Sequence, residues 1–179
     1  MLRLDTRLER WVVEHRVHRL DDLFIALSHI GSYGMIWLLL AALAVLVWRR
    51  PAIFMYVLAG EVLADVTSYG LRYAIGRDRP PLRFAEPRPL VHVPLNPSFP
   101  SGHAATSFAC AATLAPFVSR RGQIVLYVLA AGIAYSRVYV GVHYPLDVLA
   151  GAAIGLGVAT ALRRLPEALR RSRRSPPAD

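Results

Sequence analysis

The sequence contains no lysine, so all 21 of its basic residues are arginine. This absence excludes a mechanism that needs a lysine Schiff base or the lysine of a P-loop. Cysteine is almost absent too: Cys110 stands alone, which excludes a disulfide scaffold and, with only scattered histidines besides it, a zinc site. Charged residues of both signs make up 18% of the chain, compared with about 25% in ordinary soluble domains. The chain is therefore too poor in charge for an ordinary soluble domain.

Hydrophobic residues are in excess and make up 55% of the 179 positions. This length suits a single domain. A net charge of +9 is typical of nucleic-acid-binding proteins, but small basic binding domains are not this hydrophobic, and the mean hydropathy is +0.38. We therefore predict an integral membrane protein with no nucleic-acid partner.

Five mostly apolar stretches approach the length of about 20 residues that a membrane-spanning helix needs. They are Ile30–Trp48, Pro51–Ala74, His103–Val118, Ile124–Tyr139 and Leu146–Leu162. The last three are short or rich in glycine and alanine, which favours helices that pack against one another rather than against lipid. The predicted fold is an all-α integral membrane helical bundle of about five transmembrane helices. A soluble bundle of the same helices is the alternative that the hydropathy disfavours.

The N-terminal segment has a different pattern. Leu4, Leu8 and Trp11 recur at helical spacing, and arginine and glutamate occupy the other positions. This pattern predicts an amphipathic helix in the membrane interface, with Asp21–His29 as a short link to the first span. The predicted divisions are an interfacial segment (1–29), a membrane domain (30–164) and a basic cytoplasmic tail (165–179) with disordered last residues.

The distribution of arginine predicts the orientation in the membrane. One set of span ends holds ten arginines and two acids: Arg49, Arg50, Arg120, Arg121, Arg163, Arg164, Arg170, Arg171, Arg173, Arg174, Glu167 and Asp179. Positive charge in short connections is typical of the cytoplasmic side of the cell (inner) membrane. The extracytoplasmic side then holds the loop Arg77–Gly102, which is too rich in proline for regular helix or sheet.

Three segments on this extracytoplasmic side contain the polar residues that suit a reaction site. They are residues 72–80, 100–103 and 136–147. Arg72, Arg79 and Arg137 supply planar guanidinium groups that suit phosphate oxygens. Ser101 and Gly102 open a predicted helix, where backbone N–H groups bind anions and glycine permits close approach. The segments therefore predict a phosphate site.

The same segments contain groups that can move protons and attack phosphorus. His103 and His143 can exchange protons near neutral pH. Asp147 lies four residues after His143, so its carboxylate can orient the imidazole and raise its nucleophilicity. These residues predict nucleophilic phosphoryl transfer.

Together the three segments resemble the type-2 phosphatidic acid phosphatase superfamily of membrane lipid phosphatases, which is related to vanadium haloperoxidases. The signature of that family is Lys-x6-Arg-Pro, Pro-Ser-Gly-His and Ser-Arg-x5-His-x3-Asp. This sequence reads Arg72-x6-Arg79-Pro80, Pro100–His103 and Ser136-Arg137-x5-His143-x3-Asp147. Arg72 stands in place of the lysine, which keeps the positive charge but changes its geometry.

The resemblance implies a role for each residue. His143 attacks phosphorus to form a phosphohistidine, Asp147 orients it, and His103 protonates the leaving oxygen and then activates water. The implied phosphate-binding residues are Arg72, Arg79, Ser101, Gly102 and Arg137, with no metal and no cofactor.

The expected substrate is a lipid phosphate or diphosphate, such as undecaprenyl diphosphate, phosphatidic acid or phosphatidylglycerol phosphate. The resemblance does not distinguish among these lipids. Alternatives are a prenyl-linked sugar phosphate phosphatase, a lipid phosphotransferase, a haloperoxidase and a non-enzymatic membrane protein with a decayed site.

Polar residues outside the motifs are assigned structural roles. Arg77, Arg83 and Arg88 are expected to be solvated or to face lipid headgroups. Asp78 is expected to pair with one of these arginines. None of the four is predicted to act in the reaction.

Two acidic residues, Glu61 and Asp65, lie four positions apart inside the second predicted span. Ionisable residues inside a span are functional candidates, and Asp65 shares a helix face with Arg72, with which it could pair. A structural ion pair and a substrate role remain equal alternatives for them. In the last span, the spacing of Gly151 and Gly155 predicts a groove for helix packing.

Overall fold

The computed structural model describes residues 2–172, and these residues form helices and loops with no strand. The α-helices are α1 (Leu2–Glu14), α2 (His18–Ile30), α3 (Met35–Trp48), α4 (Ala52–Ile75), α5 (Pro80–Arg83), α6 (Gly102–Leu114), α7 (Arg120–Tyr139) and α8 (Pro145–Ser172). Two short 3₁₀ turns, η1 (Ser32–Gly34) and η2 (Ala115–Phe117), follow α2 and α6. The all-α prediction is confirmed.

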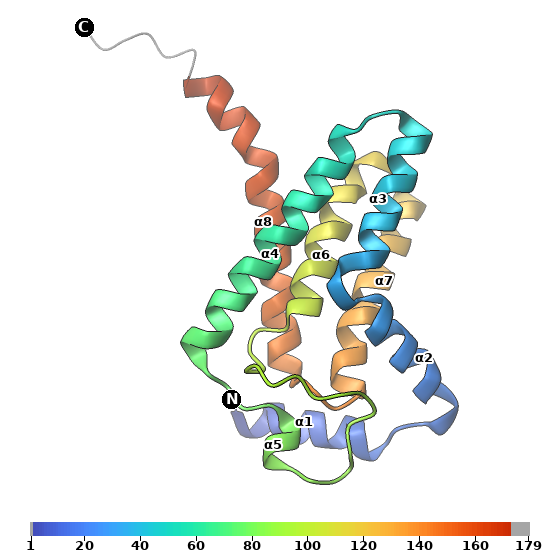
Figure 1. The fold of residues 1–179 in the computed structure, drawn as a ribbon, viewed down its shortest axis with the longest axis vertical. Coiled ribbons are helices and arrows are strands. Elements are labelled where there is room, and N and C mark those ends of the chain that lie inside the picture. Colours follow the sequence, from blue (N-terminus) through green and yellow to red (C-terminus); the bar gives the residue numbers. More distant parts are fainter. Residues whose placement is uncertain (1, 173–179) are drawn as a thin grey trace, which may run out of the picture.

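The long helices α3, α4, α6, α7 and α8 run along one axis, and α6 lies among the others (Figure 1). At one end of this bundle, α1 lies across the helix axes, beside α5 and the loop that leads to α6 (Figure 1). The side chains of α6 are mostly small and buried, including Ala104, Ala105, Ala109 and Ala111. A helix with this composition can be surrounded by other helices at short range.

The connections follow from local sequence. Only Arg49, Arg50 and Pro51 separate α3 from α4, so these helices form a hairpin. Gly76 ends α4 in the left-handed conformation (φ 66°), and its N–H donates to the Arg72 carbonyl. This cap turns the chain just before residues 77–79, and thereby places two arginines of the first motif at the end of the bundle.

At two positions of α8, a glycine without a side chain lets the helix come close to α6. A Cβ added to Gly151 would overlap the Ser101 carbonyl oxygen, and one added to Gly155 would overlap the Ala105 carbonyl oxygen. The predicted packing groove is therefore confirmed. It brings the two helices together backbone against backbone, next to the start of α6.

Replacing Gly155 by alanine is expected to destabilise the fold. The new Cβ would push against main chain, which cannot rotate away, and overpacking of this kind costs about 1–3 kcal/mol. Gly157→Ala is the matched control, because nothing lies within 4 Å of its Cβ position and alanine favours helix. Thermal unfolding of the two variants in detergent should show a lowered Tm for Gly155→Ala alone. Equal Tm values would contradict the tight contact.

The sequence-based boundaries of the first span are wrong. Asp21–His29, expected to be a link, lies inside α2, and the helix of the span begins only at Met35. Gly34 interrupts the helix, since its φ of 63° is not helical. Glycine adopts this conformation without the strain that other residues would have. As a result α2 and α3 meet at a bend of 66°.

Length and composition identify fewer spans than predicted. Within residues 2–172, helical segments 52–83 and 145–164 are long and apolar enough to cross a membrane, and α2 with α3 would add one bent span. The third predicted span is shorter than expected, because α6 ends at Leu114 and a 3₁₀ turn follows. The number of five spans stays a prediction.

The predicted C-terminal tail begins as helix. Residues 165–172, assigned to a separate tail, continue α8 without a break. The remaining tail residues, 173–179, for which disorder was predicted, lie outside the described residues. The proline-rich loop is irregular as predicted, apart from the single turn α5, which Pro80 begins.

Candidate active site

The residues of the three motifs converge at the end of the bundle beside α1. They line or back a cavity of about 670 Å³. Arg72, Arg79, Gly102, His103, Arg137 and His143 line it. Ser101 and Asp147 are fully buried and lie behind the wall. Segments as far apart in the sequence as 72–80 and 136–147 thus form one site, as the alternation of the helices predicts.

The core of the site is a histidine–carboxylate pair. The Nδ1 atom of His143, in the loop between α7 and α8, is 3.3 Å from Oδ2 of Asp147, in the first turn of α8. The backbone N–H of Tyr144 donates to the same Oδ2 atom at 3.0 Å. A carboxylate can only accept a hydrogen bond, so we assign the imidazole proton to Nδ1.

The other ring nitrogen of His143, Nε2, then carries a lone pair and no proton. Nη1 of Arg79 is 3.0 Å from Nε2 of His143, and because a guanidinium only donates, Nε2 must accept. Burial, and then the positive charge of Arg79, lowers the pKa of His143 well below its usual range. The lowered pKa favours the neutral imidazole, which is the form that a nucleophile requires, and His143 lines the cavity.

Arg79 is held in place by the loop. Its Nε and Nη2 atoms donate to the carbonyl and side-chain oxygens of Asn96 at 2.8 and 2.7 Å, and Nη1 donates to the Val142 carbonyl at 2.9 Å. Asn96 was missed by the sequence reasoning, because no spacing pattern links it to the motifs. The anchored guanidinium is preorganised for binding an anion.

Gly102 makes room for Arg72. A Cβ on Gly102 would lie 2.5 Å from Nη2 of Arg72 and 3.6 Å from Oδ1 of Asp65. The glycine of the Ser-Gly-His motif therefore allows the guanidinium at the end of α4 to approach the start of α6. Asp65 and Glu61 line the same cavity as Arg72, and the pairing of Asp65 with Arg72 stays a prediction.

Helix α2 and the turn η1 that follows it supply contacts that the sequence analysis did not predict. Nη1 of Arg137 donates a short hydrogen bond to the Ser28 hydroxyl. The Ser32 hydroxyl lies 3.3 Å from Nε2 of His103. Both serines stand near the break between α2 and α3, so this break orients one arginine and one histidine of the site.

The assignment of Arg77 as a solvated residue is wrong. Its side chain is only 13% exposed, and it donates to Asp147 and to Asp5 of α1. The other two arginines agree with the prediction: Arg83 pairs with Asp78 at 3.5 Å, and both side chains are exposed. Arg88 is exposed as well.

The acidic side of α1 faces the loop that carries His143. Asp5 and Glu9 are each 2% exposed, whereas Leu4, Leu8 and Trp11 are largely exposed. Burial raises the pKa of Glu9 to about 7, against the opposing charges of Arg10 and Arg16. A buried carboxyl group with this pKa makes stability depend on pH.

Replacing Glu9 by glutamine is expected to reduce the loss of stability at high pH. The unfolded chain ionises Glu9 near pH 4.5 and the native chain near 7, so unfolding is favoured as the pH rises through that window. Above pH 7 the wild type should therefore have a lower Tm than Glu9→Gln. Glu14→Gln, at an exposed position of the same helix, is the control. A Tm that falls equally in all three proteins between pH 5 and 8 would contradict the assignment.

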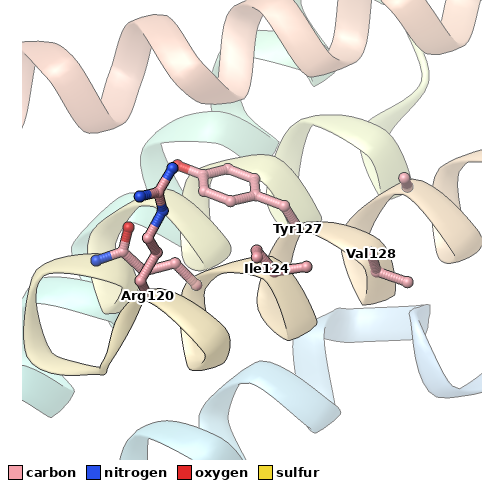
Figure 2. A pocket seen from close by; sticks show the side chains of 6 residues that line it. Arg120, Ile124, Tyr127 and Val128 are labelled. Atoms are coloured by element: carbon pink, nitrogen blue, oxygen red, sulfur yellow. The ribbon is translucent and has the colours of Figure 1, made fainter.

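A second hollow lies on the outer face of α7 and has different chemistry. Its volume is about 410 Å³, and its lining includes Arg120, Ile124, Tyr127 and Val128. Figure 2 shows these side chains extending from α7. No histidine or carboxylate lines it, so among the described residues this hollow has no histidine–carboxylate pair like that of the first cavity.

Comparison with known proteins agrees with this geometry. A family model described as the PAP2 superfamily matches residues 37–171. The undecaprenyl-diphosphatase of Sulfolobus acidocaldarius is 33% identical over 142 residues, which cover 79% of this chain and 68% of that protein.

Solved structures show the same fold. Aquifex aeolicus LpxE superposes with a TM-score of 0.76 at 28% identity, covering 88% of this chain and 93% of that one. A transmembrane PAP2 type phosphatidylglycerolphosphate phosphatase from Bacillus subtilis gives a TM-score of 0.75 at 26% identity, covering 93% and 86%.

Proposed function

Because the chain belongs to the PAP2 superfamily and is a membrane lipid phosphatase, we propose that it hydrolyses a prenyl lipid phosphate or diphosphate, with undecaprenyl diphosphate as the leading substrate. The observation that carries the reaction is the His143–Asp147 pair at a cavity wall, with Nε2 free of a proton and faced by Arg79. The similarity to an undecaprenyl-diphosphatase supports the choice of lipid.

In the proposed first step, Nε2 of His143 attacks the terminal phosphorus, and the bond from phosphorus to the leaving oxygen breaks. Asp147 stabilises the positive charge that develops on the imidazole. His103 donates a proton to the leaving oxygen, so that the lipid departs with a protonated oxygen. The product on the enzyme is a phosphohistidine.

In the second step, His103 accepts a proton from water, and the water oxygen attacks the phosphohistidine. The bond to Nε2 breaks, and inorganic phosphate leaves. Arg72, Arg79 and Arg137 hold the equatorial oxygens in both steps, together with the N–H groups at the start of α6. Donors fixed where negative charge develops provide most of the catalysis in phosphoryl transfer.

The test of this function is phosphate release by the purified protein from undecaprenyl diphosphate, phosphatidic acid and phosphatidylglycerol phosphate. Undecaprenyl diphosphate should be the fastest, and release should continue in excess EDTA, since we propose that no metal takes part. Among residues 2–172, no group of three or more histidine, cysteine or acidic residues could hold a metal ion. In ¹⁸O-labelled water the released phosphate should gain the label. Transfer of phosphate to another acceptor instead would identify a phosphotransferase.

We also propose five membrane spans, formed by α3, α4, α6, α7 and α8, with the site on the extracytoplasmic side of the cell membrane. In this arrangement 1–29 is the interfacial segment, 30–164 the catalytic domain, and 165–179 the basic cytoplasmic end. The exposure of Leu4, Leu8 and Trp11 on α1 supports contact with lipid at the interface.

Cysteine labelling in intact cells is expected to reveal this orientation. On a Cys110→Ala background, a cysteine at Leu95, which is fully exposed in the loop, should react with a membrane-impermeant maleimide. A cysteine at Ser172, at the end of α8, should react only after the cells are permeabilised. The reverse pattern would place the site on the cytoplasmic side and contradict the proposed orientation.

A further inference from the structure

A continuous line of ionic contacts connects the N-terminal helix to the histidine–carboxylate pair. Oδ2 of Asp5, in α1, accepts from Nη2 of Arg77 at 2.6 Å. Nη1 of the same guanidinium donates to Oδ1 of Asp147 at 2.5 Å. The other oxygen of Asp147 faces His143. Four residues from three separate parts of the chain are therefore in series.

Arg77 determines which way the Asp147 carboxylate faces. With Oδ1 held by the guanidinium, Oδ2 is the oxygen left for the imidazole and for the Tyr144 N–H. The guanidinium is itself confined, because its carbon lies 4.0 Å from the centre of the Tyr144 ring. The contact therefore restrains both the carboxylate and the residue that follows His143.

Asp5 acts on the same carboxylate by a second route. Its Oδ1 atom accepts from the backbone N–H of Leu146 at 2.8 Å, in the first turn of α8. That N–H has no partner within its own helix, so a carboxylate from α1 caps the helix that carries Asp147. One side chain of α1 thus holds both Arg77 and the backbone beside Asp147.

Because these groups are buried, the loss of one ionic contact would be costly. The side chains of Asp5 and Asp147 are 1% and 0% exposed, and Arg77 stands between them. If the guanidinium is removed, two buried carboxylates face each other without a counter-charge. Relief of that repulsion requires a shift of α1 or of the start of α8, and the second shift moves the catalytic pair.

We infer that Asp5 and Arg77 are positioning residues of the phosphatase reaction, and that α1 is part of the active-site assembly rather than only an interfacial anchor. The inference rests on the proposed roles of His143 and Asp147. Neither positioning residue lines the cavity, so each acts through Asp147 and not on the substrate.

The experiment measures kcat and KM of Arg77→Gln, Arg77→Lys and Asp5→Asn with one lipid substrate in one detergent. Arg77→Gln should lower kcat about 10- to 100-fold with KM changed less than threefold, in the range seen when outer-shell partners of a site are removed. Arg77→Lys should retain more activity, because an ammonium group can still contact one carboxylate. Asp5→Asn, which keeps the shape of the side chain, should also lower kcat. Arg83→Gln, which removes an exposed ion pair, is the matched control and should match wild type.

A double-mutant cycle tests whether the effect passes through Asp147. If Arg77 acts only by orienting that carboxylate, Arg77→Gln combined with Asp147→Asn should be no slower than Asp147→Asn alone. If the two losses multiply in the double variant, the inference is wrong. It is also wrong if Arg77→Gln and Asp5→Asn each have a kcat within twofold of wild type. If the His143→Ala variant keeps the activity of the wild type, the proposed function itself is wrong. Failure of the inference and failure of the proposed function therefore give different results.

Discussion

Replacing His143 by alanine is expected to abolish phosphate release. Nε2 of this residue is the nitrogen proposed to form the covalent intermediate, and it carries a lone pair rather than a proton because Nδ1 faces Asp147. Loss of a covalent nucleophile removes the two-step route entirely, so the rate should fall at least about 10³-fold. The measurement is the initial rate of phosphate release at matched amounts of folded protein.

His29→Ala is the control for this prediction. His29 lines the same cavity but lies at the end of α2, outside the three motifs. This variant should keep most of the wild-type rate. A His143→Ala protein with a tenth or more of the wild-type rate would show that the nucleophile has been misassigned.

Replacing Arg72 by alanine should produce the second large loss. The guanidinium lies against Gly102 at the start of α6, where the phosphoryl oxygens are proposed to bind. Removal of one such donor should cost about 2–4 kcal/mol of transition-state stabilisation, which corresponds to roughly 30- to 1,000-fold in kcat/KM. Arg72→Lys should keep substantial activity, because the ammonium group retains the charge and is the side chain of the family signature.

The comparison of the two Arg72 variants separates charge from shape. Activity of Arg72→Ala equal to wild type would show that Arg72 does not replace the lysine of the signature. A loss in Arg72→Lys as large as in Arg72→Ala would show that the forked geometry of the guanidinium is required. Arg83→Ala, at an exposed position, should behave as wild type.

The motif residues could be predicted because each pattern is short. A histidine four positions before an aspartate, or a serine and glycine at the start of a helix, is visible within a few residues. Alternating helices then bring the three segments to one end of the bundle. The structure places Arg72, Arg79, His103, Arg137 and His143 around a single cavity, as this reasoning requires.

The supporting residues could not be predicted, because their partners are distant in the sequence. Asp5 and Arg77 are 72 positions apart, and nothing in the neighbourhood of either one indicates the other. Arg77 was assigned to solvent for the same reason: an arginine in a polar loop is usually exposed. The break between α2 and α3 was missed because glycine within an apolar run only weakly indicates a helix end.

The contact between α6 and α8 has a consequence for any attempt to change the substrate. Ser101, at the start of α6, donates its backbone N–H to the Asp147 carbonyl at 2.9 Å, and main chain fills the space along Gly151 and Gly155. The spacing between the acid–base histidine and the nucleophile is thus determined by two backbones that have no rotamers to adjust. Engineering of lipid selectivity should therefore begin at Val91 and His92 in the loop and at the end of α2, where side chains border the cavity, and leave the α6–α8 interface untouched.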